Sequence, residues 1–278
     1  AHLCLSHYVT NETPAAAFVT AAIYFCLRVL CQRHSPEDER NRKAEFWNSL
    51  WAGVALGCAL LTKFSAVLAL PVLAGVLVWP TRGARSSELH LGLRRAGTFL
   101  VAVVALCGWH YGRVCIHFGT PLVGNWDAAS GFAWWQLPGY HTTEYYTRFG
   151  EAFLRPLFSS FASFADGVYA TLWGDGLASR AAWMAFRPPW NYEFMLAAGV
   201  LAGIATCLIG VGFAAGTARA LRQADVVWVL FAGLLAVFAL GILYMSLRVP
   251  SYAQVKAFYG LPALLPLAPA CLDLGFIK

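Results

Sequence analysis

Long apolar runs alternate with short polar stretches along the whole chain. An α-helix needs about 20 predominantly apolar residues to cross a bilayer. The longest run, residues 46–79, contains a single charged residue, Lys63, and its length suits two crossings rather than one. Because a lysine at the centre of a span costs about 3 kcal/mol or more, we expect two helices joined by a tight turn at Lys63.

Further apolar runs each suit one crossing: residues 14–30, 97–112, 194–216, 226–247 and 257–272. With the pair around Lys63 they make about seven crossings. No stretch between residues 113 and 193 is apolar for long enough to cross, so this segment is expected to form one large external loop. The pattern therefore predicts an all-α polytopic membrane protein, with a single transmembrane domain over residues 1–278 that includes the loop 113–193.

The loop 113–193 is rich in tryptophan and tyrosine, which favour the membrane–water interface. Within it, residues 151–164 place apolar side chains at helical spacing: Phe153, Leu154, Leu157, Phe158, Phe161 and Phe164. This spacing predicts an amphipathic helix. The helix is expected either to lie on the bilayer surface or to pack on the protein's own spans.

Composition and charge agree with a membrane protein. Only 12% of the residues are charged, against about 25% in soluble domains. The net charge of +6 comes from arginines in the short loops, so it does not indicate a nucleic-acid partner. By the positive-inside rule, the loops 31–45, 80–95 and 217–225 are cytoplasmic. Glu12, Lys63 and the loop 113–193 then face the lumen of the endoplasmic reticulum or the outer side of a bacterial inner (plasma) membrane.

The external face collects cations and carboxylates beside aromatic rings. Cations at a membrane interface suit a phosphate group carried by a lipid, and carboxylates suit a base or a group that positions an acceptor. The candidate phosphate ligands are Lys63, Arg113, Lys256 and Tyr259. The candidate catalytic carboxylates are Glu12, Asp127 and Asp175.

Several of these candidates also have a plain structural interpretation. Lys63 and Lys256 fit interfacial lysines whose ammonium groups reach toward water, and Asp175 precedes a glycine in a sequence that favours a turn. The histidines outside the cytoplasmic loops do not follow a metal-ligand spacing, and the sequence has no glycine-rich phosphate loop. The residues by themselves therefore predict no metal site.

Four stretches along the chain are similar to motifs of a known superfamily. They are SHYVTNE (residues 6–12), GCALLTK (57–63), GWHYGRVCIHFGTP (108–121) and KAFYGLPALLP (256–266). In this order they resemble the membrane-embedded GT-C glycosyltransferases, which include the protein O-mannosyltransferases and the aminoarabinose transferases of lipid A.

The resemblance implies an enzyme that transfers a sugar from a polyprenyl-phosphate donor to a lipid, glycan or protein acceptor on the outer face, with inversion of the anomeric carbon. By the same resemblance, Lys63 contacts the donor's phosphate, and Glu12 helps to position the acceptor or a divalent metal, the one cofactor left open. Lys256 stands where many members have arginine. The superfamily's main catalytic aspartate lies upstream of the position of Ala1, so the chain is expected to lack the base.

Two other functions stay open at the level of the sequence. A transporter or flippase of lipid-linked sugars would use the same cationic face. It would need a polar path through the spans, whose interiors carry almost no ionisable groups. The second is a non-catalytic membrane scaffold, which agrees with the expected lack of a base.

Overall fold

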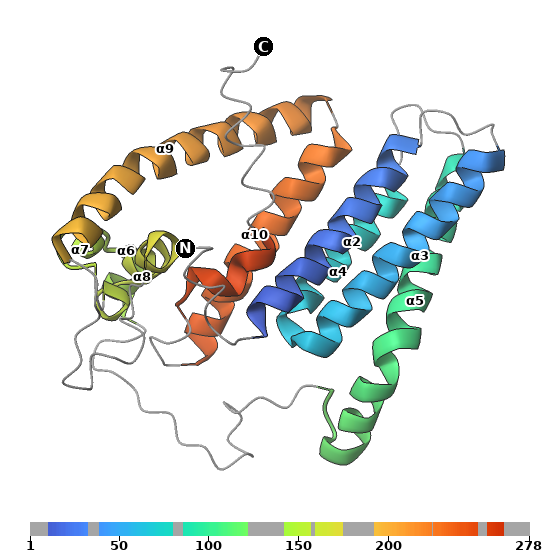
Figure 1. The fold of residues 1–278 in the computed structure, drawn as a ribbon, viewed down its shortest axis with the longest axis horizontal. Coiled ribbons are helices and arrows are strands. Elements are labelled where there is room, and N and C mark those ends of the chain that lie inside the picture. Colours follow the sequence, from blue (N-terminus) through green and yellow to red (C-terminus); the bar gives the residue numbers. More distant parts are fainter. Residues whose placement is uncertain are drawn as a thin grey trace. The chain divides into compact units, whose positions relative to one another are not determined.

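The computed structural model describes residues 11–32, 39–79, 86–121, 142–156, 159–174, 192–223, 225–249 and 255–263. All regular secondary structure in these ranges is helical (Figure 1), which confirms the all-α prediction. The chain divides into two compact units. Unit 1 comprises Ala1–Val9, Asn125–Gly212 and Ala239–Leu261, and unit 2 comprises Thr10–Gly124, Phe213–Phe238 and Pro262–Lys278. The predicted single domain, with its loop 113–193, stays a prediction.

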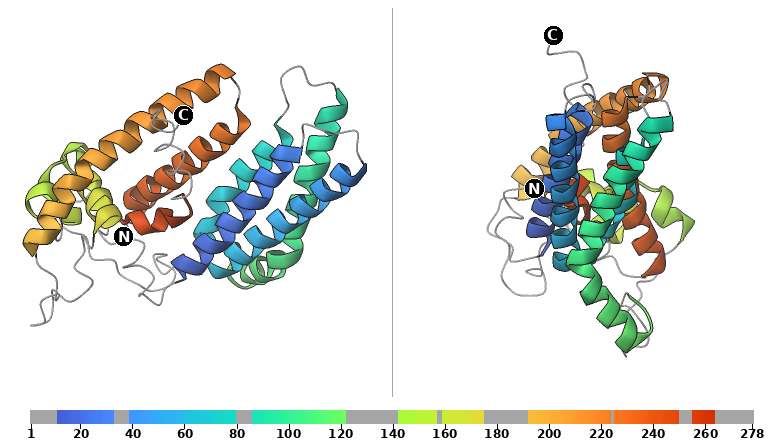
Figure 2. Two further views of the ribbon diagram at one scale, coloured as in Figure 1. Left: turned by 45° about the horizontal axis from the view of Figure 1, so that its top comes forward. Right: turned by 90° about the vertical axis from the view of Figure 1, so that its right-hand side faces the viewer.

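Unit 2 is built on a bundle of four α-helices that lie side by side (Figures 1 and 2). They are α2 (Glu12–Gln32), α3 (Glu39–Thr62), α4 (Ala69–Val78) and α5 (Ser86–Phe118), with the short 3₁₀ helix η1 (Phe64–Leu68) between α3 and α4. Their facing sides form one apolar core, in which Ile23, Leu56, Leu73 and Phe99 are fully buried. The bundle therefore buries one apolar stripe from each helix, as the hydrophobic pattern requires.

The turn predicted at Lys63 is confirmed. α3 ends at Thr62, and Lys63 has an extended backbone with φ −155° and ψ 130° before η1 begins. Lys63 therefore lies at the junction of two helical segments rather than within a span.

Four helices in the described ranges are long and apolar enough to cross a membrane: Glu12–Gln32, Glu88–Phe118, Leu196–Gln223 and Val226–Arg248. Phe64–Val78 is a shorter apolar helical segment. The last predicted span, 257–272, is described only as far as Ala263, and its first part is the 3₁₀ helix η6 (Ala257–Ala263). An integral membrane protein fits these helices, and the count of about seven crossings stays a prediction.

Two of the predicted cytoplasmic loops are partly helical, which corrects their bounds. α3 begins at Glu39 and α5 at Ser86, inside the segments 31–45 and 80–95. Long charged side chains are good helix formers, and Glu39 and Lys43 form an i, i+4 ion pair at 2.9 Å. The described charged residues of these segments, from Glu39 and from Glu88 onward, lie at the polar ends of two helices.

Close packing of α3 on α5 depends on two glycines that are four residues apart. A Cβ atom at Gly53 would overlap the Phe99 carbonyl oxygen and lie 2.7 Å from the Ala102 Cβ. A Cβ at Gly57 would lie 3.0 Å from Leu106. Small residues at this spacing let helix backbones approach closely in membranes, so the pair fixes where α3 and α5 meet.

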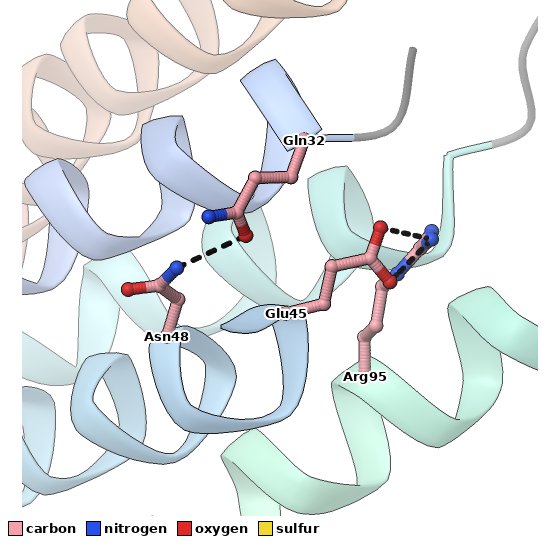
Figure 3. A network of polar contacts seen from close by, with 4 residues as sticks. All are labelled: Gln32, Glu45, Asn48 and Arg95. Carbon is pink, nitrogen blue, oxygen red and sulfur yellow. Dashed lines mark hydrogen bonds and ion pairs between the residues drawn. The ribbon is translucent and has the colours of Figure 1, made fainter. Parts of the chain in front are cut away.

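A polar network joins α2, α3 and α5 near the start of α3 (Figure 3). Arg95 on α5 donates from Nε and Nη2 to both carboxylate oxygens of Glu45 on α3, at 2.9–3.0 Å. Asn48 donates from Nδ2 to Gln32 Oε1 on α2 at 3.1 Å. Both side chains of the ion pair are nearly buried. A bidentate arginine–carboxylate contact is short and directional, so it fixes the rotation of α3 against α5.

Unit 1 contains the short helices α6 (Thr143–Thr147), α7 (Glu151–Leu154) and η3 (Ser159–Phe161) and the longer α8 (Phe164–Trp173). Parts of α9 (Tyr192–Gln223) and α10 (Val226–Arg248), and most of η6, also belong to it. The amphipathic helix predicted over residues 151–164 is wrong. α7 stops at Leu154 because Pro156 disfavours a helical backbone at Arg155, whose φ and ψ are −140° and 77°.

Asp166 connects the starts of α7 and α8. Its Oδ1 accepts from the backbone N–H groups of Gly150 and Ala152, both at 2.9 Å, and its Oδ2 accepts from Ser163 Oγ at 2.8 Å. Ser163 caps α8 by accepting from the Asp166 N–H at 3.0 Å. This reciprocal pair resembles a capping box, and it satisfies a carboxylate that is almost fully buried.

α8 is attached to α9 by two side chains within unit 1. The Tyr169 hydroxyl donates to the Gly199 carbonyl at 2.5 Å, and Trp173 Nε1 donates to Thr206 Oγ1 at 2.8 Å. Burial raises the pKa of the Tyr169 hydroxyl, opposed by its contact with Thr206. The hydroxyl therefore stays protonated as a donor, and α8 packs on one of the protein's own apolar helices.

The close approach of α3 and α5 predicts opposite results for two glycines. Gly53→Ala should lower the free energy of unfolding by about 1–3 kcal/mol because the new methyl group overlaps α5. Gly97→Ala on α5 should leave it unchanged or raise it slightly, because its Cβ would meet nothing within 4 Å. Melting temperatures of the purified protein in detergent check the pair, and equal shifts would contradict the packing.

The Glu45–Arg95 contact predicts a large effect of removing one charge. Glu45→Gln should destabilise the fold by about 3 kcal/mol, because it leaves the Arg95 guanidinium nearly buried without its counter-ion. Glu39→Gln should change stability by less than about 0.5 kcal/mol, since its ion pair with Lys43 is exposed. Thermal unfolding of both variants measures these effects. A loss of stability in Glu39→Gln but not in Glu45→Gln would contradict the role assigned to the Glu45–Arg95 contact.

Candidate functional site

The site is centred on an ion pair between Glu12 and Lys63 in unit 2. Glu12 lies in the first turn of α2, where the helix dipole favours a negative charge. Only 5% of its side-chain surface is exposed, against 21% for Lys63. The two candidates that the sequence placed on one face are therefore in direct contact, with the carboxylate more deeply buried than the ammonium group.

The backbone on both sides of Lys63 is held by hydrogen bonds. The Lys63 N–H donates to the Ala59 carbonyl at 2.8 Å, and the Lys63 carbonyl accepts from the Ala66 N–H at 3.2 Å. Asn11, next to Glu12, donates from Nδ2 to the Thr62 carbonyl at 3.3 Å. The last carbonyls of a helix need such partners, so the start of α2 holds both the side chain of Lys63 and the residue before it.

An open pocket of about 320 Å³ lies beside Lys63. Its lining comes from the start of α2, the α3–η1 junction and the end of α5: Asn11, Leu60, Leu61, Thr62, Lys63, Phe64, His110, Tyr111, Val114, Phe118 and Pro121. Apolar side chains and polar groups contribute to this lining in about equal measure. A concave site of this composition suits an amphiphilic ligand with an apolar chain and a polar or charged head.

Two predicted site residues of unit 2 do not line this pocket. Glu12 is nearly buried and forms an ion pair with Lys63, so it can orient the lysine. Arg113 is exposed on α5, and its guanidinium carbon lies 6.0 Å from the centre of the Trp109 ring. That contact is a cation–π arrangement, and a phosphate role for Arg113 stays a prediction.

The other predicted site residues belong to unit 1 or lie outside the described residues. Lys256 and Tyr259 belong to unit 1, where both are half-buried and the Tyr259 N–H donates to the Lys256 carbonyl at 3.1 Å. Asp127 and Asp175 lie outside the described residues. Their predicted roles stay predictions.

The described residues do not form a set of metal ligands. No group of three or more histidine, cysteine, aspartate or glutamate side chains comes together there. Glu12, the carboxylate that the resemblance linked to a metal, has the Lys63 ammonium group as its partner. A divalent metal therefore stays an open expectation of the resemblance.

Sequence reasoning missed the wall that α5 contributes to the pocket. His110, Tyr111, Val114 and Phe118 line it, and they follow the i, i+1, i+4, i+8 spacing of one helix face. The predicted span ended at residue 112, whereas α5 continues to Phe118. The spacing itself is visible in the sequence. A predicted helix that continued to Phe118 would therefore have placed these side chains on one face.

One protein family matches the N-terminal part of the chain, which contains Glu12 and Lys63. Residues 1–114 match the family model described as dolichyl-phosphate-mannose-protein mannosyltransferase. The match includes Glu12, Lys63 and Tyr111, and it confirms the predicted resemblance to a GT-C membrane glycosyltransferase over this segment. The description of that family names an enzyme that uses a dolichyl-phosphate mannose donor. No curated protein and no solved structure matches the chain.

The burial of Glu12 predicts that its partner matters for stability. Glu12→Gln should lower the free energy of unfolding by about 3 kcal/mol, because it leaves the Lys63 cation beside a neutral group in an apolar setting. The double variant Glu12→Gln/Lys63→Gln should recover much of this loss, since no unpaired charge remains. Thermal unfolding in detergent checks the set. If Lys63→Gln lowered the stability of the Glu12→Gln protein further instead of restoring it, the result would contradict the pairing.

Proposed function

We propose that this protein is a membrane glycosyltransferase whose donor, a sugar linked to dolichyl phosphate or a related polyprenyl phosphate, binds in the pocket beside Lys63. The observation that carries the proposal is the position of Lys63. Lys63 lines a pocket that has both polar groups and an apolar wall, in the segment that matches the mannosyltransferase family.

The chemistry of the donor fits the pocket. A lipid-linked sugar phosphate joins a long apolar chain to a negatively charged phosphodiester. The apolar lining, with Phe64 and Phe118, suits the chain, and Lys63 suits the phosphate. An ammonium group carries three N–H donors, so the ion pair with Glu12 is compatible with a further contact to a phosphate oxygen.

The proposed role of Lys63 extends from binding to the transfer step. An acceptor hydroxyl attacks the anomeric carbon and loses its proton to a carboxylate base. The bond between that carbon and the phosphate oxygen breaks, and the lipid phosphate leaves with the electron pair. Negative charge then grows on the phosphate, where a fixed cation stabilises the transition state.

The carboxylates are assigned different roles. Glu12 is buried against Lys63, which suits a positioning residue that keeps the ammonium group directed. Asp127 and Asp175 stay candidates for the base or for positioning the acceptor. The acceptor is a protein by analogy with the family's description, with a lipid or a glycan as the alternatives, and the reaction is placed on the external face of the endoplasmic reticulum or a bacterial inner membrane.

Removing the Lys63 charge tests the proposal. Lys63→Ala in the intact protein should reduce transfer from the lipid-linked donor by about 100-fold or more, the effect of losing one stabilising group at a developing charge. Lys43→Ala, an exposed lysine at the polar end of α3, should leave transfer unchanged. The assay measures transfer of a radiolabelled sugar from dolichyl phosphate in liposomes.

A second variant separates loss of the Lys63 charge from loss of folding. The variant Glu12→Gln/Lys63→Gln removes the ammonium group without leaving Glu12 charged and unpaired, and it should show the same loss of transfer. Full activity in a folded protein without the Lys63 charge would contradict the proposed role.

A further inference from the structure

We propose that Tyr111 is a positioning residue for the donor, which fixes the backbone around Lys63 and thereby sets the affinity for the lipid phosphate. This inference rests on the proposed role of Lys63 as the phosphate ligand. It adds Tyr111 of α5, which was not among the candidate site residues, to the site formed by Glu12 and Lys63.

Tyr111 contacts residues on both sides of Lys63. Its hydroxyl donates to the Leu60 carbonyl at 2.7 Å. Its ring meets the Phe64 ring edge to face, with the centroids 5.9 Å apart and the planes at 66°. One side chain of α5 therefore holds the last turn of α3 and the first residue of η1.

The Leu60 carbonyl needs this partner because of the turn at Lys63. In a continuous helix it would accept from the N–H of residue 64. α3 ends at Thr62, and Lys63 is extended, so that helical bond is lost. A helix carbonyl left without a partner costs about 1–3 kcal/mol when it is buried. The Tyr111 hydroxyl supplies the missing donor, so the turn that directs Lys63 is stabilised from α5.

Two helices thus hold Lys63 from different sides. Asn11 and Glu12 at the start of α2 hold the Thr62 carbonyl and the Lys63 ammonium group. Tyr111 holds the backbone and also lines the pocket itself. Reactive groups must be held within about 0.5 Å of their productive position. Loosening this turn should therefore lower the affinity for the phosphate without unfolding the bundle.

The Tyr111 hydroxyl is separable from the packing of α5. The approach of α3 to α5 depends on Gly53 and Gly57, and its rotation on the Glu45–Arg95 contact. Tyr111→Phe keeps the ring and its contact with Phe64 and removes the hydroxyl alone. The matched control is Tyr244→Phe, the same change at a tyrosine of α10 that is 63% exposed.

The test is a double-mutant cycle on donor binding. Dolichyl phosphate in detergent is titrated into the intact wild type, Tyr111→Phe, Lys63→Gln and the double variant, and KM and kcat for the sugar donor are measured where transfer is detectable. Tyr111→Phe should raise the Kd and the KM by roughly five- to tenfold, the worth of one hydrogen bond. Any fall in kcat should be smaller than the rise in KM, because Lys63 keeps its charge and the hydroxyl affects only its position. Tyr244→Phe should change none of these values.

The double variant separates the possible results. In the Lys63→Gln background, Tyr111→Phe should add no further loss of affinity, because its effect is transmitted through Lys63. An unchanged Kd in Tyr111→Phe, or an equal loss with and without the lysine, overturns the role of Tyr111 while the proposed function stands. An unchanged Kd in Lys63→Gln overturns the phosphate role of Lys63 and the inference with it. If Lys63→Gln does not fold, Glu12→Gln/Lys63→Gln serves as the background.

Discussion

The ion pair between Glu12 and Lys63 is the constraint on which the site depends. A charged group in an apolar bundle is costly unless it is paired, so removing either residue alone is expected to destabilise the bundle. The pair joins the start of α2 to the turn between α3 and η1, residues that are 51 positions apart in the sequence. It thereby determines both where the hydrophobic run is interrupted and where a cation meets the pocket.

α3 is held near both of its ends by charged contacts, and the two contacts do different work. Glu45 and Arg95 are bidentate and nearly buried, so their effect is to fix packing. At the other end Lys63 is partly exposed and borders a pocket, so its charge is available to a ligand. The glycines between them bring α3 against α5 and deliver Tyr111 to the end of α3. Packing within the bundle and geometry at the site are therefore linked through one helix.

The pattern of apolar residues predicted much of this fold. The helices α2, α9 and α10 and the turn at Lys63 follow from run length and from the cost of a buried lysine. The helix over residues 151–164 failed because a proline outweighed helical spacing, and the helical ends of two charged loops were missed because charge alone does not separate a loop from a polar helix end. Within the site, Lys63 and Glu12 could be selected from the sequence, whereas the bond from Tyr111 to Leu60 could not, since it joins residues on different helices.

An experimental structure of the intact protein with dolichyl phosphate bound tests the central claim most directly. We expect a phosphate oxygen at about 2.8 Å from the Lys63 ammonium nitrogen, with Glu12 still paired to the lysine and the lipid chain along the apolar wall formed by Phe64 and Phe118. A phosphate bound away from Lys63, with the pocket empty or filled by another group, would contradict the role assigned to this lysine.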